Sequence, residues 1–271
     1  MDPITLPAST DVQALIVDMD GVLWEGNRAL PGLDGFFAAI RRRALKVVLA
    51  TNNASQTPEQ YVAKLAGFGV VATPAEVMTS AVATAEVLAA RDLPNRKAFV
   101  IGGDGIRTAM TEAGFELLDL YETGAAVVVV GMDRGLSWDK LATATLNLRA
   151  GSAFIGTNPD LTVPTEHGTT HGNGAILAAL TAATGLMPEI IGKPEPTMYQ
   201  LILRRLALAP ASALAVGDRL DTDILGAIRA GMPSVCVLSG IATLADITAC
   251  EARPSAVMAG LPELTDWLNA A

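Results

Sequence analysis

Two aspartates close the first apolar run of the chain. The segment ALIVDMDGVLW, residues 14–24, passes from four apolar residues into Asp18 and Asp20, and Gly21 follows. Unpaired charge inside a buried strand is costly, so we expect both carboxylates at the carboxyl edge of a sheet, where open α/β sheets bind their ligands. There one aspartate could attack an electrophile while the other exchanges a proton with the leaving group. Taken alone, the pair also fits a solvated loop with a turn-forming glycine.

Two further segments offer donors and a cation for an anionic group. The segment KVVLATNNAS, 46–55, is apolar until Thr51 and Asn52, whose side chains can donate to an oxyanion; an Asn-rich turn that caps a helix is the alternative. In EIIGKPEP, 189–196, Lys193 stands between a glycine and a proline. Most lysines are solvated surface groups, but a lysine held rigidly beside carboxylates would balance the charge of a nucleophile and a phosphate.

A fourth segment carries three carboxylates. The run ALAVGDRLDTDI, residues 213–224, is apolar at first and then contains Asp218, Asp221 and Asp223. Carboxylates gathered without histidine or thiol ligands suit a hard cation bound through oxygen, above all Mg²⁺.

The elements that must position these residues follow an alternating pattern. Short runs rich in Val and Ile alternate with longer Ala/Leu segments at helical spacing, which predicts βαβ units and a parallel sheet in an α/β fold. One helix should begin at Thr57 and Pro58, where a capping hydroxyl precedes a proline of the first turn. Its inward face would carry Tyr61, Leu65 and Phe68. The expected strands are 13–18, 46–51, 76–79, 97–102, 125–131, 152–156, 188–191, 213–217 and 233–238.

The composition disfavours several classes of protein. Of the 271 residues, 51% are apolar and only 4% aromatic, so aliphatic side chains must form the core. A net charge of -9 opposes nucleic-acid binding, which usually needs a basic face. Apolar runs such as 125–131 are too short to span a membrane, and the opening MDPITLPASTD lacks the pattern of a secretory signal. Cys236 and Cys250 cannot supply a disulfide framework, so we expect a cytoplasmic protein.

In this order, the four segments resemble the motifs of the haloacid dehalogenase (HAD) superfamily of phosphotransferases. DMDGVLW resembles the first motif, TNN the second, GKP the third, and GDRLDTDI the fourth. The spellings DGVLW and TNN, together with FIGTNPDLTVPTEHGTTHGNGAIL at 154–177, resemble the NagD-like, para-nitrophenylphosphatase branch. The resemblance spans nearly the whole chain. It implies a phosphatase with a Rossmann-like parallel-sheet core and an inserted α/β cap of the type called C2.

The resemblance also implies roles for the acidic residues. Asp18 would be the nucleophile that forms an aspartyl-phosphate, and Asp20 the general acid and base. Mg²⁺, the implied cofactor, would be held by the carboxylates of Asp18 and Asp218 and by the backbone carbonyl of Asp20. Asp223 would orient water on the metal. Asp221 falls at a variable position of the motif and is expected to be a surface or helix-capping residue.

The phosphoryl oxygens would be bound by the second and third motifs. The resemblance assigns this role to Thr51, Asn52 and Lys193, with Asn53 nearby. Such donors are needed because a phosphate dianion is repelled by an aspartate nucleophile until nearby positive charge offsets both.

The insertion between TNN and GKP is far longer than one crossover requires. The family places a cap there, so we assign residues 1–83 and 187–271 to the catalytic core and 84–186 to the cap. The Gly-rich segment IGGDGIRTAMTEAG at 101–114 lacks the full G-x-G-x-x-G spacing. It is therefore expected to be a strand-to-helix turn of the cap, rather than a nucleotide site.

Substrate choice is expected to reside in the cap, because the core motifs contact only the phosphoryl group and its ester oxygen. The polar stretch from Thr157 to Asn173, which contains Gly and Pro, is predicted to be a loop that reaches the site. The candidate specificity residues in it are Asp160, Leu161, His167 and His171. Two histidines cannot build a zinc cluster, and a plain surface position is the alternative for both.

Other functions compete with hydrolysis of a small phosphometabolite. A mutase of the same superfamily would pass the phosphoryl group to a second hydroxyl, but mutases usually carry a smaller helical cap after the first motif. A catalytically idle binding or regulatory protein would not need the intact motif residues. Dehalogenation is disfavoured because the Asp20 position is filled. The sequence leaves the substrate open, and a homodimer formed through the cap is an expectation from the family alone.

Overall fold

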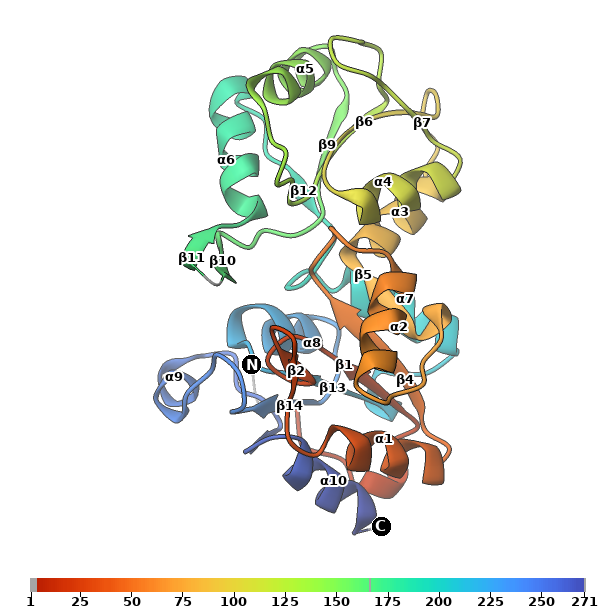
Figure 1. Cartoon of the computed structure of the whole chain (residues 1–271), viewed down its shortest axis with the longest axis vertical. Coiled ribbons are helices and arrows are strands. Elements are labelled where there is room, and N and C mark those ends of the chain that lie inside the picture. The colour runs from red at the N-terminus through yellow and green to blue at the C-terminus, as the bar shows by residue number, and fades with distance from the viewer. Residues whose placement is uncertain (1–3, 166, 271) are drawn as a thin grey trace. The chain divides into compact units, whose positions relative to one another are not determined.

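The computed structural model describes residues 4–165 and 167–270 (Figure 1). The chain divides into two compact units. The first unit comprises Met1–Thr51, Tyr61–Met78 and Lys193–Ala271, and the second comprises Asn52–Gln60 and Thr79–Gly192. The domain boundaries expected from the sequence, after residues 83 and 186, stay predictions.

The first unit is built on a six-stranded sheet in the order β15-β14-β13-β1-β4-β5. The pairings of β15 with β14, β14 with β13, β13 with β1 and β1 with β4 are parallel. Every residue of β1 and β13 is buried, as expected for parallel strands covered on both faces. The strands are β1 (Ala14–Val17), β4 (Lys46–Thr51), β5 (Val77–Thr79), β13 (Ala213–Gly217), β14 (Ser234–Val237) and β15 (Ala256–Met258).

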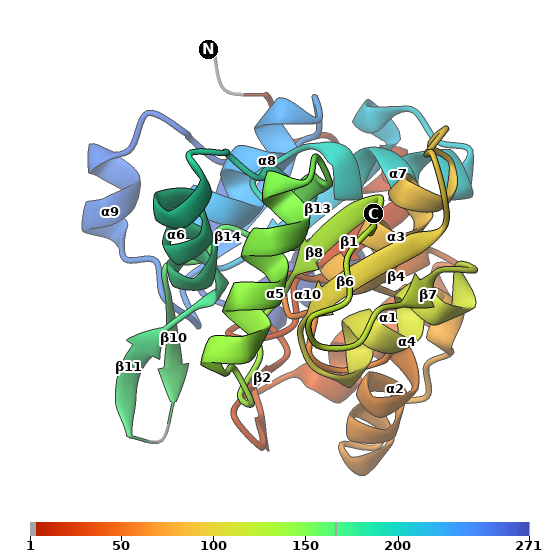
Figure 2. The ribbon, with the colours of Figure 1, turned by 90° about the horizontal axis from the view of Figure 1, so that it is seen from above.

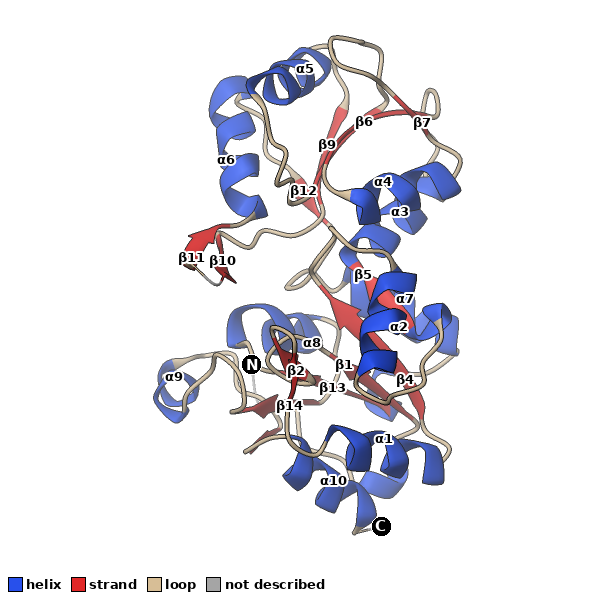
Figure 3. Ribbon diagram, viewed as in Figure 1, coloured by secondary structure: helices blue, strands red, loops and turns tan. Residues whose placement is uncertain are grey.

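Helices cover both faces of this sheet (Figures 2 and 3). Helices α1 (Leu33–Arg42) and α10 (Leu261–Asn269) pack together on one face, and α7 (Thr197–Leu206) and α8 (Leu225–Arg229) lie on the other. The remaining elements are the hairpin β2 (Trp24–Glu25) and β3 (Arg28–Ala29), helix α9 (Leu244–Ala249), the 3₁₀ turns Ser9–Asp11, Pro74–Glu76 and Pro210–Ser212, and a π-helical turn, Leu220–Ile224. Helix α2 (Pro58–Gly67) belongs to the first unit from Tyr61 onward.

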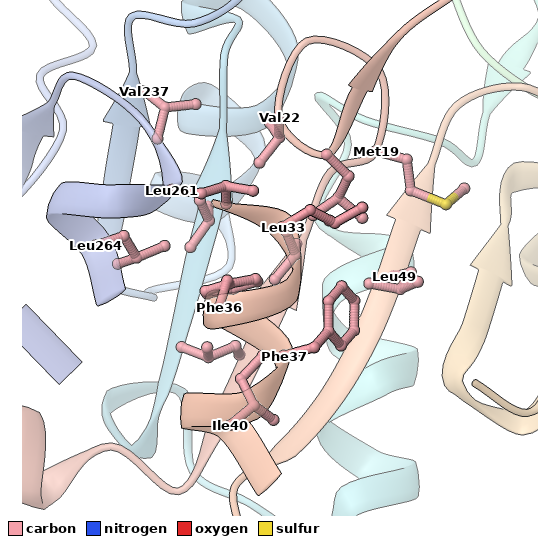
Figure 4. Packing of buried hydrophobic residues seen from close by; sticks show 14 of the residues in the cluster. Met19, Val22, Leu33, Phe36, Phe37, Ile40, Leu49, Val237, Leu261 and Leu264 are labelled. Carbon is pink, nitrogen blue, oxygen red and sulfur yellow. The ribbon is translucent and has the colours of Figure 1, made fainter. Parts of the chain in front are cut away.

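The core of the first unit joins α1 and α10 to the sheet. Figure 4 shows Phe36 and Phe37 of α1 among the side chains of this cluster, with Leu49 of β4 and Leu261 and Leu264 of α10. These five residues are at most 4% exposed. Burying one such side chain contributes about 1.5–3 kcal/mol. The packing therefore fixes the strands whose ends carry the polar motifs.

The predicted start of α2 is confirmed. Thr57 and Gln60 form a reciprocal cap: the Thr57 N–H donates to Oε1 of Gln60 at 2.9 Å, and the Gln60 N–H donates to Oγ1 of Thr57 at 3.4 Å. Tyr61 and Leu65 are buried and Phe68 is half-buried, as their helical spacing predicts.

The second unit holds a five-stranded sheet in the order β12-β9-β8-β6-β7, with every pair parallel. Its helices pair α3 with α4 and α5 with α6, on opposite faces of the sheet (Figure 2). The strands are β6 (Lys97–Ile101), β7 (Glu116–Leu117), β8 (Val127–Val130), β9 (Ala153–Gly156) and β12 (Glu189–Ile190). The helices are α3 (Ser80–Ala89), α4 (Asp104–Glu112), α5 (Trp138–Arg149) and α6 (Asn173–Thr184).

Every strand predicted from the sequence has a counterpart, and the predicted α/β fold is confirmed. The segment 101–114 contains the turn from β6 into α4, as expected. The loop predicted at Thr157–Asn173 is wrong in part, because this stretch contains an antiparallel hairpin, β10 (Thr162–Thr165) with β11 (Gly168–His171). Within residues 4–165 and 167–270, no helix has the length and apolar character that crossing a membrane requires.

Candidate active site

The ends of β1 and β13 bring two aspartates to the same edge of the first unit's sheet. Val17 pairs with Val216 in the parallel ladder, and the N–H of Asp18 donates to the carbonyl oxygen of Val216 at 2.8 Å. Asp18 directly follows β1, and Asp218 directly follows β13. Both residues therefore lie at the carboxyl edge, where the sequence placed them.

Asp223 completes a cluster of three carboxylates. Asp18, Asp218 and Asp223 each offer one oxygen, and these oxygens lie within 4.8 Å of one another. The Asp18 side chain is 13% exposed and that of Asp223 is 3% exposed. Asp223 belongs to the π-helical turn before α8, in which the Ile224 N–H donates to the carbonyl oxygen of Arg219 at 3.2 Å. Such wide turns recur at functional sites.

Lys193 is buried between these carboxylates. Its Nζ atom donates to Oδ1 of Asp18 at 2.5 Å, to Oδ1 of Asp223 at 2.6 Å and to the carbonyl oxygen of Ala50 at 2.9 Å. The Lys193 side chain is 2% exposed. Although burial alone would lower the pKa of this ammonium, the charges of Asp18 and Asp223 raise it well above its usual value. Lys193 is therefore a fixed positive charge in the site.

The site holds three carboxyl groups around the Lys193 ammonium. Burial raises the pKa of Asp18, and although Lys193 lowers it, the pKa stays well above its usual range. Burial, followed by the charge of Asp223, raises the pKa of Asp218 to about 7. The three carboxylates thus repel one another in a buried, poorly solvated site. A hard divalent cation prefers such oxygen donors and would offset their charge, so the residues present fit Mg²⁺.

The carboxylates differ in their protein partners. Asp223 uses both oxygens, since Oδ1 accepts from Lys193 and Oδ2 accepts from the N–H of Arg219 at 3.1 Å. Asp218 accepts through Oδ2 from the N–H of Ile241 at 2.8 Å. These contacts suit Asp223 to orienting the lysine, and Asp218 to presenting its second oxygen to an ion.

Two glycines, Gly21 and Gly240, lie against the carboxylate of Asp218. A Cβ atom added at Gly21 or Gly240 would lie well inside 3.0 Å of Oδ2 of Asp218. Gly21 also has a φ of +80°, which L side chains rarely adopt. The sequence pointed to Gly21 as the turn-forming glycine beside the aspartate pair, whereas Gly240, which stands in LSGIA with no local signal, was missed.

Asp20 lies on the loop that follows β1, and its side chain is exposed. The indole Nε1–H of Trp24 donates to Oδ1 of Asp20 at 2.7 Å. This contact was not predicted from the sequence. Asp221 is also exposed and pairs with Arg219 at 2.9 Å, as a surface residue would.

The second motif divides between the two units. Thr51 ends β4 in the first unit and is 3% exposed. Asn52 belongs to the second unit, where its Nδ2 atom donates to Oδ2 of Asp160 at 3.2 Å. The carbonyl oxygen of Asn52 accepts from Oγ of Ser80 at 2.6 Å and from Nδ2 of Asn158 at 2.8 Å. The Asn52 amide is thus held by residues that lie far along the chain.

The other residues predicted from the second unit occupy turns and surface. Oδ1 of Asn53 accepts from the N–H and the hydroxyl of Ser55 at 2.9 and 2.7 Å. Leu161 is 69% exposed, and His167 and His171 are exposed at the hairpin. Residue 166 of the predicted specificity segment lies outside the described residues.

Comparison with known proteins gives matches over most of the chain. The model of the haloacid dehalogenase-like hydrolases matches residues 15–116, and an HAD-hydrolase-like model matches residues 190–264. An acid sugar phosphatase of Staphylococcus aureus is 38% identical over 235 residues, which is 87% of this chain and 90% of that protein.

Three solved structures align over nearly all of the chain. The 4-nitrophenylphosphatase from Thermotoga maritima has a TM-score of 0.90 and 31% identity over 96% of this chain and 99% of that one. NagD from E. coli has a TM-score of 0.86 and 33% identity, covering 93% and 98%. A glycerol phosphate phosphatase from Mycobacterium tuberculosis, solved in complex with magnesium, has a TM-score of 0.88 and 33% identity, covering 96% and 78%.

The parallel sheet with acidic residues and a buried lysine at its carboxyl edge, taken with these matches, defines an enzyme of the phosphatase class. The chain belongs to the haloacid dehalogenase-like hydrolases, and its predicted place in their NagD-like branch is confirmed.

Proposed function

We propose that this phosphatase hydrolyses a small phosphomonoester through an aspartyl-phosphate on Asp18, with Mg²⁺ as its cofactor. The observation that carries the proposal is the Lys193 ammonium, which bridges Asp18 and Asp223 inside the carboxylate cluster. One ammonium among three carboxylates leaves negative charge that a divalent ion would offset. The Mycobacterium tuberculosis relative solved with magnesium supports this choice of ion.

Asp18 is the proposed nucleophile because it directly follows β1 at the carboxyl edge of the sheet and is the most exposed of the three clustered carboxylates. Attack by an Asp18 oxygen forms a bond to phosphorus while the ester P–O bond breaks, and Asp20 gives a proton to the departing oxygen. Asp20 then takes a proton from water, whose oxygen attacks phosphorus. The P–O bond to Asp18 breaks, which releases inorganic phosphate and restores the carboxylate.

The metal would be held by the carboxylates of Asp18 and Asp218 and by the backbone carbonyl of Asp20. When bound, Mg²⁺ supplies positive charge that stabilises the transferred phosphoryl group. Asp223 keeps the Lys193 ammonium in place through the 2.6 Å contact.

The donors to the phosphoryl oxygens are proposed to be Thr51, Asn52, Asn53 and Lys193. The ammonium of Lys193 is fixed by its burial, and the amide of Asn52 is fixed by the contact with Asp160. Donors fixed before the reaction stabilise developing charge at little cost of reorganisation.

The substrate is proposed only as a class. The relatives are named for sugar phosphate, glycerol phosphate and 4-nitrophenyl phosphate, which share a phosphomonoester and little else. The shared feature is a small phosphomonoester, and we propose a small phosphorylated metabolite as the substrate. A cytoplasmic location is also proposed, and the two cysteines, both free thiols, agree with it.

Hydrolysis of 4-nitrophenyl phosphate tests the proposal. We expect activity with Mg²⁺, loss of activity in EDTA, and inhibition by Ca²⁺, which prefers more ligands and looser geometry. Asp18→Asn should abolish turnover, whereas Asp221→Asn, a surface change, should not. Release of phosphate and 4-nitrophenol in equal amounts would separate hydrolysis from transfer to another hydroxyl. Full turnover in metal-free protein would contradict the Mg²⁺ requirement, and full turnover in Asp18→Asn would contradict the role of Asp18 as nucleophile.

A further inference from the structure

Trp24 touches the side chain of Asp20 through a single polar atom. Its indole N–H donates to Oδ1 of Asp20 at 2.7 Å. The backbones of the two residues also form a β-bridge, and the Gly21 N–H donates to the carbonyl oxygen of Trp24 at 2.8 Å. An exposed carboxylate on a loop can adopt several rotamers, and a hydrogen bond from a fixed donor selects one of them.

The donor is fixed because Trp24 is fully buried, at 0% exposed. Its ring stacks on Tyr61, with centroids 6.4 Å apart and planes 18° apart, and lies 6.0 Å from Phe68. The Nζ atom of Lys64 lies over the face of the Trp24 ring, 4.3 Å from its centroid, and forms a cation–π contact. All three neighbours come from α2 and the residues just after it. Packing against α2 and Phe68 thus holds the indole in place, and its N–H donates to Oδ1 of Asp20.

We propose that Trp24 is a positioning residue that occupies Oδ1 of Asp20, so that Oδ2 is the oxygen that exchanges the proton with the leaving group. The inference rests on the proposed role of Asp20 as general acid. It goes beyond that role by assigning the orientation of the carboxyl to a named side chain. A tryptophan that served only as core would affect all substrates alike, whereas a positioning residue matters most where the leaving group needs a proton.

A series of substituted phenyl phosphates tests this difference. Phenyl and 4-nitrophenyl phosphate are similar in shape, but the nitrophenol leaves readily without a proton and the phenol does not. For Trp24→Phe we expect kcat/KM to fall by roughly tenfold more on phenyl than on 4-nitrophenyl phosphate, part of the ~10²–10⁴ that general acid catalysis supplies. Both substrates are measured on one preparation, so the ratio is independent of the fraction of folded protein.

Control variants separate the inference about Trp24 from the proposed general-acid role of Asp20. Trp267→Phe changes a half-buried tryptophan on α10 and should keep the wild-type ratio. Asp20→Asn should lower the ratio of kcat/KM on phenyl phosphate to kcat/KM on 4-nitrophenyl phosphate further than Trp24→Phe does. If Asp20→Asn keeps the wild-type ratio, the general-acid role fails. If Asp20→Asn lowers this ratio and Trp24→Phe keeps the wild-type value, the general-acid role of Asp20 stands and the inference about Trp24 is overturned.

A second measurement covers the case in which Trp24→Phe does not fold. The chain has three tryptophans, and each gives one indole N–H signal in a ¹H–¹⁵N NMR spectrum. Asp20→Ala removes the acceptor and should shift one signal, that of Trp24, while Trp138 and Trp267 stay unchanged. Three unshifted signals would mean that the contact is absent in solution, and the inference would fall.

Discussion

Raising the pH should destabilise the metal-free protein through Asp218. Burial and the charge of Asp223 raise the pKa of Asp218 from 3.8 to about 7. A carboxyl group whose pKa is higher in the folded state contributes stability that is present below pH 3.8 and is lost as the pH rises through 7. Between pH 5 and pH 8 the loss is about 2–3 kcal/mol, since one pKa unit corresponds to about 1.4 kcal/mol. Asp18, whose pKa is also raised, acts in the same direction.

Urea denaturation in EDTA at pH 5 and pH 8 measures this loss. The asparagine of Asp218→Asn cannot ionise, so this variant should lose about 2–3 kcal/mol less than the wild type over the same range. Asp221→Asn is the matched control, because Asp221 is 71% exposed, and it should follow the wild type. Excess Mg²⁺ should stabilise the wild type more at pH 8 than at pH 5, because it binds the ionised carboxylate. Equal losses in the wild type and Asp218→Asn would refute the reasoning.

Three further substitutions probe the surroundings of the site. In Gly240→Ala the added Cβ would crowd Oδ2 of Asp218, so activation by Mg²⁺, titrated through the rate, should need a higher ion concentration. Lys193→Met leaves two buried carboxylates without their cation; we expect no turnover and a loss of about 3–5 kcal/mol in urea denaturation. The sequence suggested Asp160 as a specificity residue, but its Oδ2 lies 3.2 Å from Nδ2 of Asn52, a proposed phosphoryl donor, so Asp160→Ala should instead lower kcat/KM by a common factor across a panel of phosphomonoesters.

Each of these predictions has a matched control. An added Cβ at Gly35 of α1 meets nothing within 4 Å, so Gly35→Ala should keep normal Mg²⁺ activation. Lys46→Met changes an exposed lysine and should retain turnover. Alanine at the exposed Leu161, His167 or His171 should alter the relative rates on different substrates, unlike Asp160→Ala. The assignments would be wrong if a control matched its variant or if Asp160→Ala changed relative rates instead.

The fold was predictable where local pattern and burial agree. The runs that became β1, β4, β8 and β13 are made largely of Val, Leu, Ile and Ala and are mostly buried. The aspartates that follow β1 and β13 were placed correctly, because charge is tolerated only where a buried parallel strand ends.

The missed features depend on contacts that a local pattern does not contain. The β10–β11 hairpin has Pro and Gly in its ladder, which are typical of a turn, and its two strands pair with each other. Gly240 lies against Asp218, from which the π-helical turn, helix α8 and strand β14 separate it along the chain. The hydrogen bond from Trp24 to Asp20 joins neighbours in sequence, yet it depends on the packing of the indole against α2.

Covalent phosphorylation of Asp18 is the central claim, and mass spectrometry of acid-quenched protein tests it most directly. The wild type should be mixed with 4-nitrophenyl phosphate and Mg²⁺, quenched during turnover, and digested. We expect one added phosphoryl group on the peptide that contains Asp18, and none in Asp18→Asn. A phosphoryl group on any other residue during turnover, or turnover with no phosphorylated protein at any quench time, would contradict the account.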